Sequence, residues 1–216
     1  MSQQHALASV VYRLAISAGA AVLALAAFGS STASARYITT VKQWTDDNVW
    51  TGLQCGGVST VGQIITIPRH IHSMHKFKFE LLNDPKAALG SMVVRGVVYA
   101  WDGTKASGSA LWESKPRTIS LPDYAAHKVV FISGYIPVTP GQQYVVFATI
   151  DKDYGACVGG SWFDFGGPVS DVYTDGSLAY QSNAGDATRW TTSDWALGAS
   201  GTINGYDLAF SVRVNF

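Results

Sequence analysis

A regular alternation of apolar and polar side chains is the feature that most limits how this chain can fold. In residues 206–216 every second residue is apolar, namely Tyr206, Leu208, Phe210, Val212, Val214 and Phe216, and Arg213 belongs to the set that faces the other way. Successive side chains of a strand point to opposite faces, so this spacing predicts a strand with one buried face. Segment 71–82 alternates in the same way and places Lys76, Lys78 and Glu80 on its polar face. The chain therefore favours sheets with one apolar side.

Two turn signals each separate a pair of predicted strands. Asp102-Gly103 ends the nearly all-apolar segment 92–101, which is typical of a central strand covered on both faces. Because apolar residues resume after this turn, we expect a hairpin there. Pro140-Gly141 lies between the apolar segments 129–135 and 144–150 and predicts a second hairpin.

The stretch 151–205 differs from the rest of the chain. It is rich in Gly, Asp, Ser and Asn, with aromatic residues scattered through it. This composition predicts long loops with short strands. Many short strands separated by turns indicate an all-β fold, either a sandwich or a barrel.

The first 35 residues have the pattern of a secretory signal peptide. Arg13 precedes the small and apolar run 14–28, and the stretch ends in Ala33-Ser-Ala35. A positive start, an apolar helical core and an Ala-x-Ala end predict cleavage after Ala35, leaving a single domain, 36–216, that is secreted or periplasmic. The alternative is an uncleaved anchor, for which the apolar run is short.

The two cysteines, Cys55 and Cys157, both lie in the exported part. An oxidising compartment makes a disulfide between them the expected state. The alternative is two buried free thiols.

Charge limits the class of partner. Lys and Arg number 15, as do Asp and Glu, so the formal net charge is +0. No run of basic residues occurs along the sequence. Nucleic acid and anionic lipid both attract clustered cations, so we expect neither as the partner.

Four stretches carry a resemblance to a known type of domain. They are Val97–Gly103, Ala110–Ser114, Thr139–Phe147 and Asp207–Val212. They resemble secreted bacterial β-sandwich domains of uncharacterised exported proteins, which are similar to the jelly-roll modules that bind carbohydrate. The resemblance runs from about Gln63 to Phe216. It implies an antiparallel β-sandwich of jelly-roll type after the signal peptide helix, and its motifs contain no catalytic signature.

Aromatic residues in the loop-rich stretch suggest a sugar-binding surface. A sugar ring presents an apolar C–H face and a rim of hydroxyls, which flat aromatic rings and polar side chains complement. Residues of both kinds occur close together in this part of the sequence. The candidate ligand-binding residues are Trp162, Trp190, Trp195, Tyr173, Tyr180, Asp164, Asp171 and Asn183.

Metal binding has weaker support. His70 and His72 would point the same way on a strand, but a zinc site needs three or four ligands that converge. Asp151 and Asp153 precede a glycine and offer oxygen ligands to calcium, although the pattern of a helical calcium loop is absent. We therefore expect no cofactor, with calcium as the one alternative.

The sequence favours binding over catalysis. It contains no Gly-x-Ser-x-Gly elbow, no His-Glu-x-x-His and no phosphate-binding glycine loop. The residues Glu80 and Glu113 are not obviously paired, as a glycosidase would require. We expect a non-enzymatic, secreted domain that binds carbohydrate or extracellular polysaccharide. The alternatives are a structural or adhesive envelope protein, a small outer-membrane β-barrel suggested by the alternating strand that ends at Phe216, and, with less support, a glycan-active enzyme.

Overall fold

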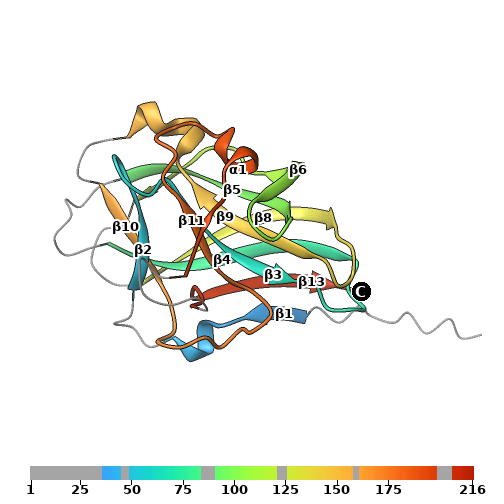
Figure 1. The fold of residues 1–216 in the computed structure, drawn as a ribbon. Helices are drawn as coiled ribbons and strands as arrows, with labels where there is room; N and C mark the ends of the chain where they lie inside the picture. Colours follow the sequence, from blue (N-terminus) through green and yellow to red (C-terminus); the bar gives the residue numbers. More distant parts are fainter. Residues whose placement is uncertain (1–35, 45–48, 84–90, 121–125, 158–160, 199–205) are drawn as a thin grey trace, which may run out of the picture. The chain divides into compact units, whose positions relative to one another are not determined.

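Two antiparallel β-sheets pack on one another with an apolar core between them (Figure 1). The computed structural model describes residues 36–44, 49–83, 91–120, 126–157, 161–198 and 206–216. The predicted signal peptide, 1–35, lies outside the described residues. The all-β sandwich predicted from the alternation is confirmed, whereas the jelly-roll arrangement of its strands stays a prediction.

The first sheet, sheet A, has the order β1-β13-β4-β10-β2, and β8 also pairs with β4. Its strands are β1 (Arg36–Thr39), β2 (Val49–Gln54), β4 (Ser73–Asn83), β8 (His127–Pro137), β10 (Trp162–Gly166) and β13 (Phe210–Asn215).

The second sheet, sheet B, has the order β12-β11-β3-β9-β5-β6, and β7 also pairs with β5. Its strands are β3 (Thr60–Thr66), β5 (Ser91–Trp101), β6 (Ala106–Glu113), β7 (Arg117–Ser120), β9 (Gln143–Thr149), β11 (Ser177–Gln181) and β12 (Ala196–Leu197). The helices of the described part are short: η1 (Val41–Gln43), η2 (Asp151–Ala156) and α1 (Arg189–Thr192). No helix among the described residues is both long and apolar enough to cross a membrane.

The core between the sheets is built by the alternation that the sequence shows. Phe77 and Phe79 of β4 and Phe210 and Val212 of β13 point into it and are buried. Phe216 follows the end of β13 and is half exposed, so the inward-facing pattern stops before the last residue.

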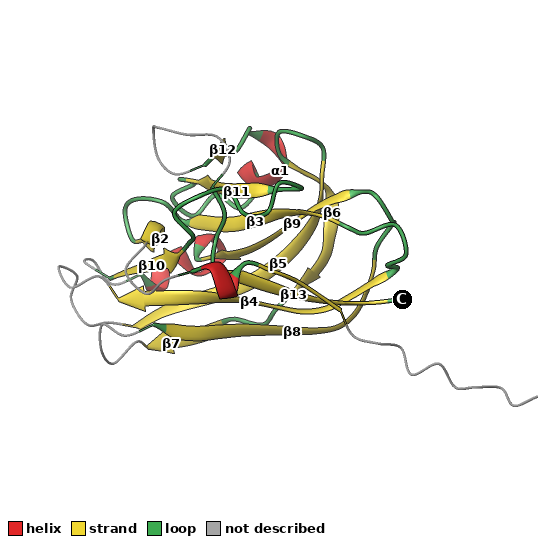
Figure 2. Ribbon diagram, turned by 90° about the horizontal axis from the view of Figure 1, so that it is seen from below, coloured by secondary structure: helices red, strands yellow, loops and turns green. Residues whose placement is uncertain are grey.

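A second apolar cluster lies on the other face of sheet B. Val97 of β5 and Phe147 of β9 belong to it, whereas their neighbours Val98 and Val146 belong to the core between the sheets. The segment 182–198, which contains α1, covers this face, and Figure 2 shows α1 on the side of β3 and β9 away from β4 and β8. The prediction that 92–101 is covered on both faces is therefore confirmed.

One predicted hairpin is confirmed and the other is wrong. β5 pairs with β6 across the Asp102-Gly103 turn. In contrast, β8 pairs with β4 in sheet A, and β9 pairs with β3 and β5 in sheet B. The Pro140-Gly141 turn therefore passes the chain from one sheet to the other. This turn is hydrogen-bonded to the segment that follows β3: the Gly141 N–H donates to the Ile67 carbonyl at 2.8 Å.

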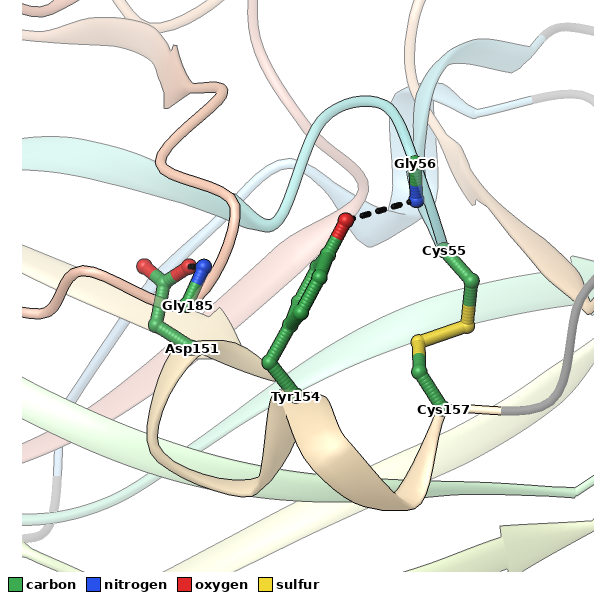
Figure 3. The surroundings of a disulfide bond; sticks show 6 residues. All are labelled: Cys55, Gly56, Asp151, Tyr154, Cys157 and Gly185. Carbon is green, nitrogen blue, oxygen red and sulfur yellow. Dashed lines mark hydrogen bonds between the residues drawn. A yellow bond between two sulfur atoms is a disulfide. The ribbon is translucent and has the colours of Figure 1, made fainter.

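The predicted disulfide between Cys55 and Cys157 is present and links the two sheets. Cys55 follows β2 of sheet A, and Cys157 follows η2 after β9 of sheet B, with 5.7 Å between the Cα atoms. Beside the bridge, the Tyr154 hydroxyl accepts a hydrogen bond of 2.9 Å from the Gly56 N–H (Figure 3).

Candidate functional site

The outer face of sheet A carries a row of half-buried cations. In β4 the inward direction of Phe77 and Phe79 forces Lys76 and Lys78 to the opposite face. This agrees with the polar face predicted for 71–82. Unlike the outer face of sheet B, this part of sheet A presents polar side chains.

The strand register brings cations from separate parts of the chain together. Arg213 of β13 lies opposite Lys76 of β4, and Tyr37 of β1 lies opposite Arg213. One step along the sheet, Ser211 lies opposite Lys78. Directly opposite residues are neighbours on one face of a sheet, so these side chains form one surface.

A hollow of about 410 Å³ lies over this surface. We call it the basic groove and define it by Tyr37, Lys76, Lys78, Lys128, Ser211 and Arg213. Lys128 belongs to β8, and the residue opposite it in the neighbouring strand β4 is Glu80. Tyr37 is 53% exposed, so a large part of this residue faces solvent.

Acidic side chains neutralise only part of the charge in the groove. The Lys78 Nζ lies 3.2 Å from Glu80 Oε1, and the Glu80 side chain is 7% exposed. Within the described residues, the other three cations have no ion pair with a carboxylate. Lys76, Lys128 and Arg213 therefore leave positive charge directed at the hollow.

Arg213 also carries an unused donor. Its Nε is buried, and no described residue accepts a hydrogen bond from it. A buried N–H without an acceptor costs on the order of 1–3 kcal/mol, so this atom is a local cost to the fold, and a ligand would meet only the part of Arg213 that lines the hollow.

The tryptophans predicted to stack on a sugar are placed elsewhere. Trp190 is 1% exposed and Trp195 is 5% exposed, both in the cluster that covers sheet B. Phe147 packs edge-on against both rings, with centroid distances of 5.2 Å. Neither indole presents an open face in this structure. The physical reason is that the second face of β5 and β9 is apolar and needs a cover, which these rings provide.

Asn183 and Asp151 belong to a buried polar network beneath this cover. Asp151 Oδ2 accepts hydrogen bonds from Thr60 Oγ1 at 2.7 Å, Trp190 Nε1 at 2.7 Å and Asn183 Nδ2 at 2.9 Å. Asn183 is 4% exposed and Asp151 is 2% exposed. Protein donors thus occupy the carboxylate that the sequence offered to calcium.

The remaining predicted ligand-binding residues are dispersed over both sheets. Trp162 and Asp164 lie on β10 of sheet A and Tyr180 on β11 of sheet B, while Asp171 is exposed in the loop between these strands. Tyr173 packs against the core, where burial raises the pKa of its hydroxyl to about 12. The structure therefore does not bring the eight predicted residues into one patch.

The acidic residue Asp153 is held by an arginine. Arg95 of β5 donates to both carboxylate oxygens of Asp153, at 2.7 and 3.2 Å, and to Glu113 Oε1 at 3.1 Å. The hydrogen bond to Asp153 raises the pKa of Arg95. The Lys152 ammonium also contacts Glu113. This cluster docks η2 onto sheet B, and Glu113 is an ion-pair partner within it.

The weak metal candidates do not converge. His70 and His72 are exposed and lie before the first residue of β4, so they do not share the strand on which the sequence placed them. In the described ranges, no group of three or more His, Cys, Asp or Glu side chains is arranged to hold a metal ion.

Sequence reasoning missed the groove because its members are far apart along the chain. Parity along the strand placed Lys76, Lys78 and Arg213 on outward faces correctly. The alternation within each strand does not predict that β13 lies beside β4. From the sequence, Arg213 therefore had no expected contact with Lys76 and Lys78. A comparison of the outward residues of all predicted strands would have shown that 71–82 and 206–216 both carry outward cations.

The chain matches no protein-family model and no curated protein.

Proposed function

We propose that this chain is an exported, non-catalytic binding domain for carbohydrate and that the basic groove is its binding site. The observation that carries the proposal is an exposed tyrosine ring beside a hollow lined by hydrogen-bond donors. Tyr37 supplies the ring, and Lys76, Lys78 and Arg213 supply donors around it.

This arrangement suits the two surfaces of a sugar. The C–H face of a pyranose packs on an aromatic ring, and its hydroxyls accept hydrogen bonds from charged donors. Ser211 also lines the hollow, and a serine hydroxyl can both donate and accept a hydrogen bond. The hollow lies within the 300–1,000 Å³ that is usual for ligand sites.

Export supports an extracellular ligand. The leader pattern of residues 1–35 and the Cys55–Cys157 bridge both fit a protein that works outside the reducing cytoplasm. An extracellular polysaccharide is therefore the favoured ligand class, with a structural or adhesive envelope role as the competing function.

Retention on immobilised polysaccharides tests the proposal. The purified protein is run by affinity electrophoresis through gels that contain a neutral or an acidic polysaccharide, beside a Tyr37→Ala variant. We expect retention that is lost in Tyr37→Ala. Tyr135→Ala is the matched control, because Tyr135 is 67% exposed and does not line the hollow. Migration of the original protein unaffected by every polysaccharide would overturn the proposal.

A further inference from the structure

We infer that the ligand of the basic groove is an acidic polysaccharide whose sugar rings carry carboxylates, a polyuronate in chemical class. This inference rests on the proposed function and narrows it. Four cationic side chains line the groove, and Glu80 is the one described acid that pairs with any of them. A neutral sugar would leave the positive charge of these side chains uncompensated, whereas a carboxylate on each ring would neutralise it.

The spacing of the cations suits a linear polyanion. Lys76 and Lys78 are alternate residues of β4, so their Cα atoms are about 7 Å apart along the strand. Arg213 lies across the sheet from Lys76, and Lys128 lies across from Glu80, beyond Lys78. The four cations thus run diagonally across β13, β4 and β8, which lets successive anionic rings each meet a cation.

Arg213 favours a carboxylate in particular. Its guanidinium is a planar fork of donors that matches the two oxygens of a carboxylate. Tyr37 is the neighbour of Arg213 across the strands, and both residues line the hollow. A ring that stacks on Tyr37 would place its carboxylate beside the Arg213 guanidinium.

Other polyanions fit the groove less well. A lipid surface is met by side chains that protrude, whereas Lys76, Lys78 and Arg213 are half-buried and line a hollow. A nucleic acid extends far beyond the hollow, over a chain whose formal net charge is +0, and it uses several stacking aromatics. Tyr37 is the sole ring with a large exposed face among the residues that line the hollow.

The test compares polygalacturonate with a neutral polysaccharide, dextran, by isothermal titration at low and high salt. We expect tighter binding to polygalacturonate, weakened by salt because screening reduces the attraction between charges. Lys76→Gln/Arg213→Gln should lower affinity by at least about tenfold, the scale set by losing hydrogen bonds to charged groups. Lys115→Gln/Arg189→Gln removes the same charge from exposed positions outside the groove and should bind as the original protein does.

Lys76→Gln/Lys128→Gln keeps the partly buried Arg213, so the test still holds if replacing Arg213 disturbs folding. The polyuronate would be overturned if the protein bound both polysaccharides equally, if Tyr37→Ala lowered the affinity and if the charge variants kept it. The proposed function would then still stand. Binding to neither polysaccharide overturns the polyuronate, and migration unaffected by every polysaccharide in the gels overturns the proposed function as well. Equal or tighter binding to anionic phospholipid vesicles or to a thymidine oligonucleotide overturns the polyuronate in favour of that polyanion.

Discussion

The indole Nε1 of Trp190 donates a hydrogen bond of 2.7 Å to Oδ2 of Asp151. Thr60, the first residue of β3, donates to the same oxygen, and the Gly185 N–H donates to Oδ1 at 3.3 Å. One buried carboxylate thus joins α1, sheet B and the turn after β11. The segment that covers sheet B is therefore anchored by polar bonds as well as by packing.

Asp151→Ala should lower the free energy of unfolding by about 3–5 kcal/mol, because it leaves several buried donors without an acceptor and removes packing atoms. Urea denaturation monitored by tryptophan fluorescence measures this loss of stability. Asp171→Ala changes an exposed residue of the same type and should shift stability by less than about 0.5 kcal/mol. Similar midpoints for the two variants would show that the network contributes little.

The positions of these residues show which parts of the fold were predictable. Side-chain direction in a strand is a local property, so alternation placed Phe77 and Phe210 inward and Lys76 and Arg213 outward. The pairing of strands is a long-range property. It depends on which edges meet, and for this reason the connection through Pro140-Gly141 was wrongly predicted as a hairpin.

Trp190 and Trp195 show the same limit for the candidate site. A segment rich in Gly and Asp is typical of exposed loops, and aromatics within it look like a ligand platform. The apolar character of both faces of 92–101 was a usable signal, because a second apolar face requires a cover. The aromatic-rich stretch 151–205 was the remaining part of the chain that could cover this face.

Trp190→Phe should separate stability from binding. The change removes the donor to Asp151 and part of the ring volume, and it should lower the free energy of unfolding by about 2–3 kcal/mol. Affinity for polysaccharide should not change, because Trp190 of α1 packs on the outer face of sheet B and the basic groove lies on sheet A. Tyr37→Ala should lower the affinity for polysaccharide and leave the free energy of unfolding nearly unchanged. Denaturation and affinity electrophoresis on both variants check this, and a loss of affinity in Trp190→Phe with the fold intact would contradict it.

Loss of the disulfide should destabilise the fold strongly. The bridge closes a loop with a sequence separation of 102, for which the chain-entropy model predicts about 4–5 kcal/mol. We expect the Cys55→Ala/Cys157→Ala protein to unfold at a much lower urea concentration than the oxidised protein. Reduced original protein should resemble this variant. Thiol titration in denaturant provides the control, since the unreduced protein should show no reactive thiol.

Asp207 links the segment before β13 to sheet B and to the loop after β10. It is fully buried, Oδ1 accepts from Gln63 Nε2 at 2.8 Å, and Oδ2 accepts from the Tyr173 N–H at 2.7 Å and the Val172 N–H at 3.0 Å. Burial raises the pKa of this carboxyl to about 6, and the nearby charge of Asp171 acts in the same direction. The three donors lower the pKa but do not outweigh burial.

The raised pKa of Asp207 predicts that stability falls as pH rises through about 6. The folded pKa lies above the value of about 4 expected in the unfolded chain, so the folded state binds the proton more tightly. This contribution is fully present below pH about 4 and is lost above the folded pKa, a change of about 2–3 kcal/mol. Asp207→Asn cannot titrate, so the difference in unfolding free energy between the two proteins, measured by urea denaturation across this range, isolates the effect. A difference that stays constant with pH would show that Asp207 titrates normally in the folded protein.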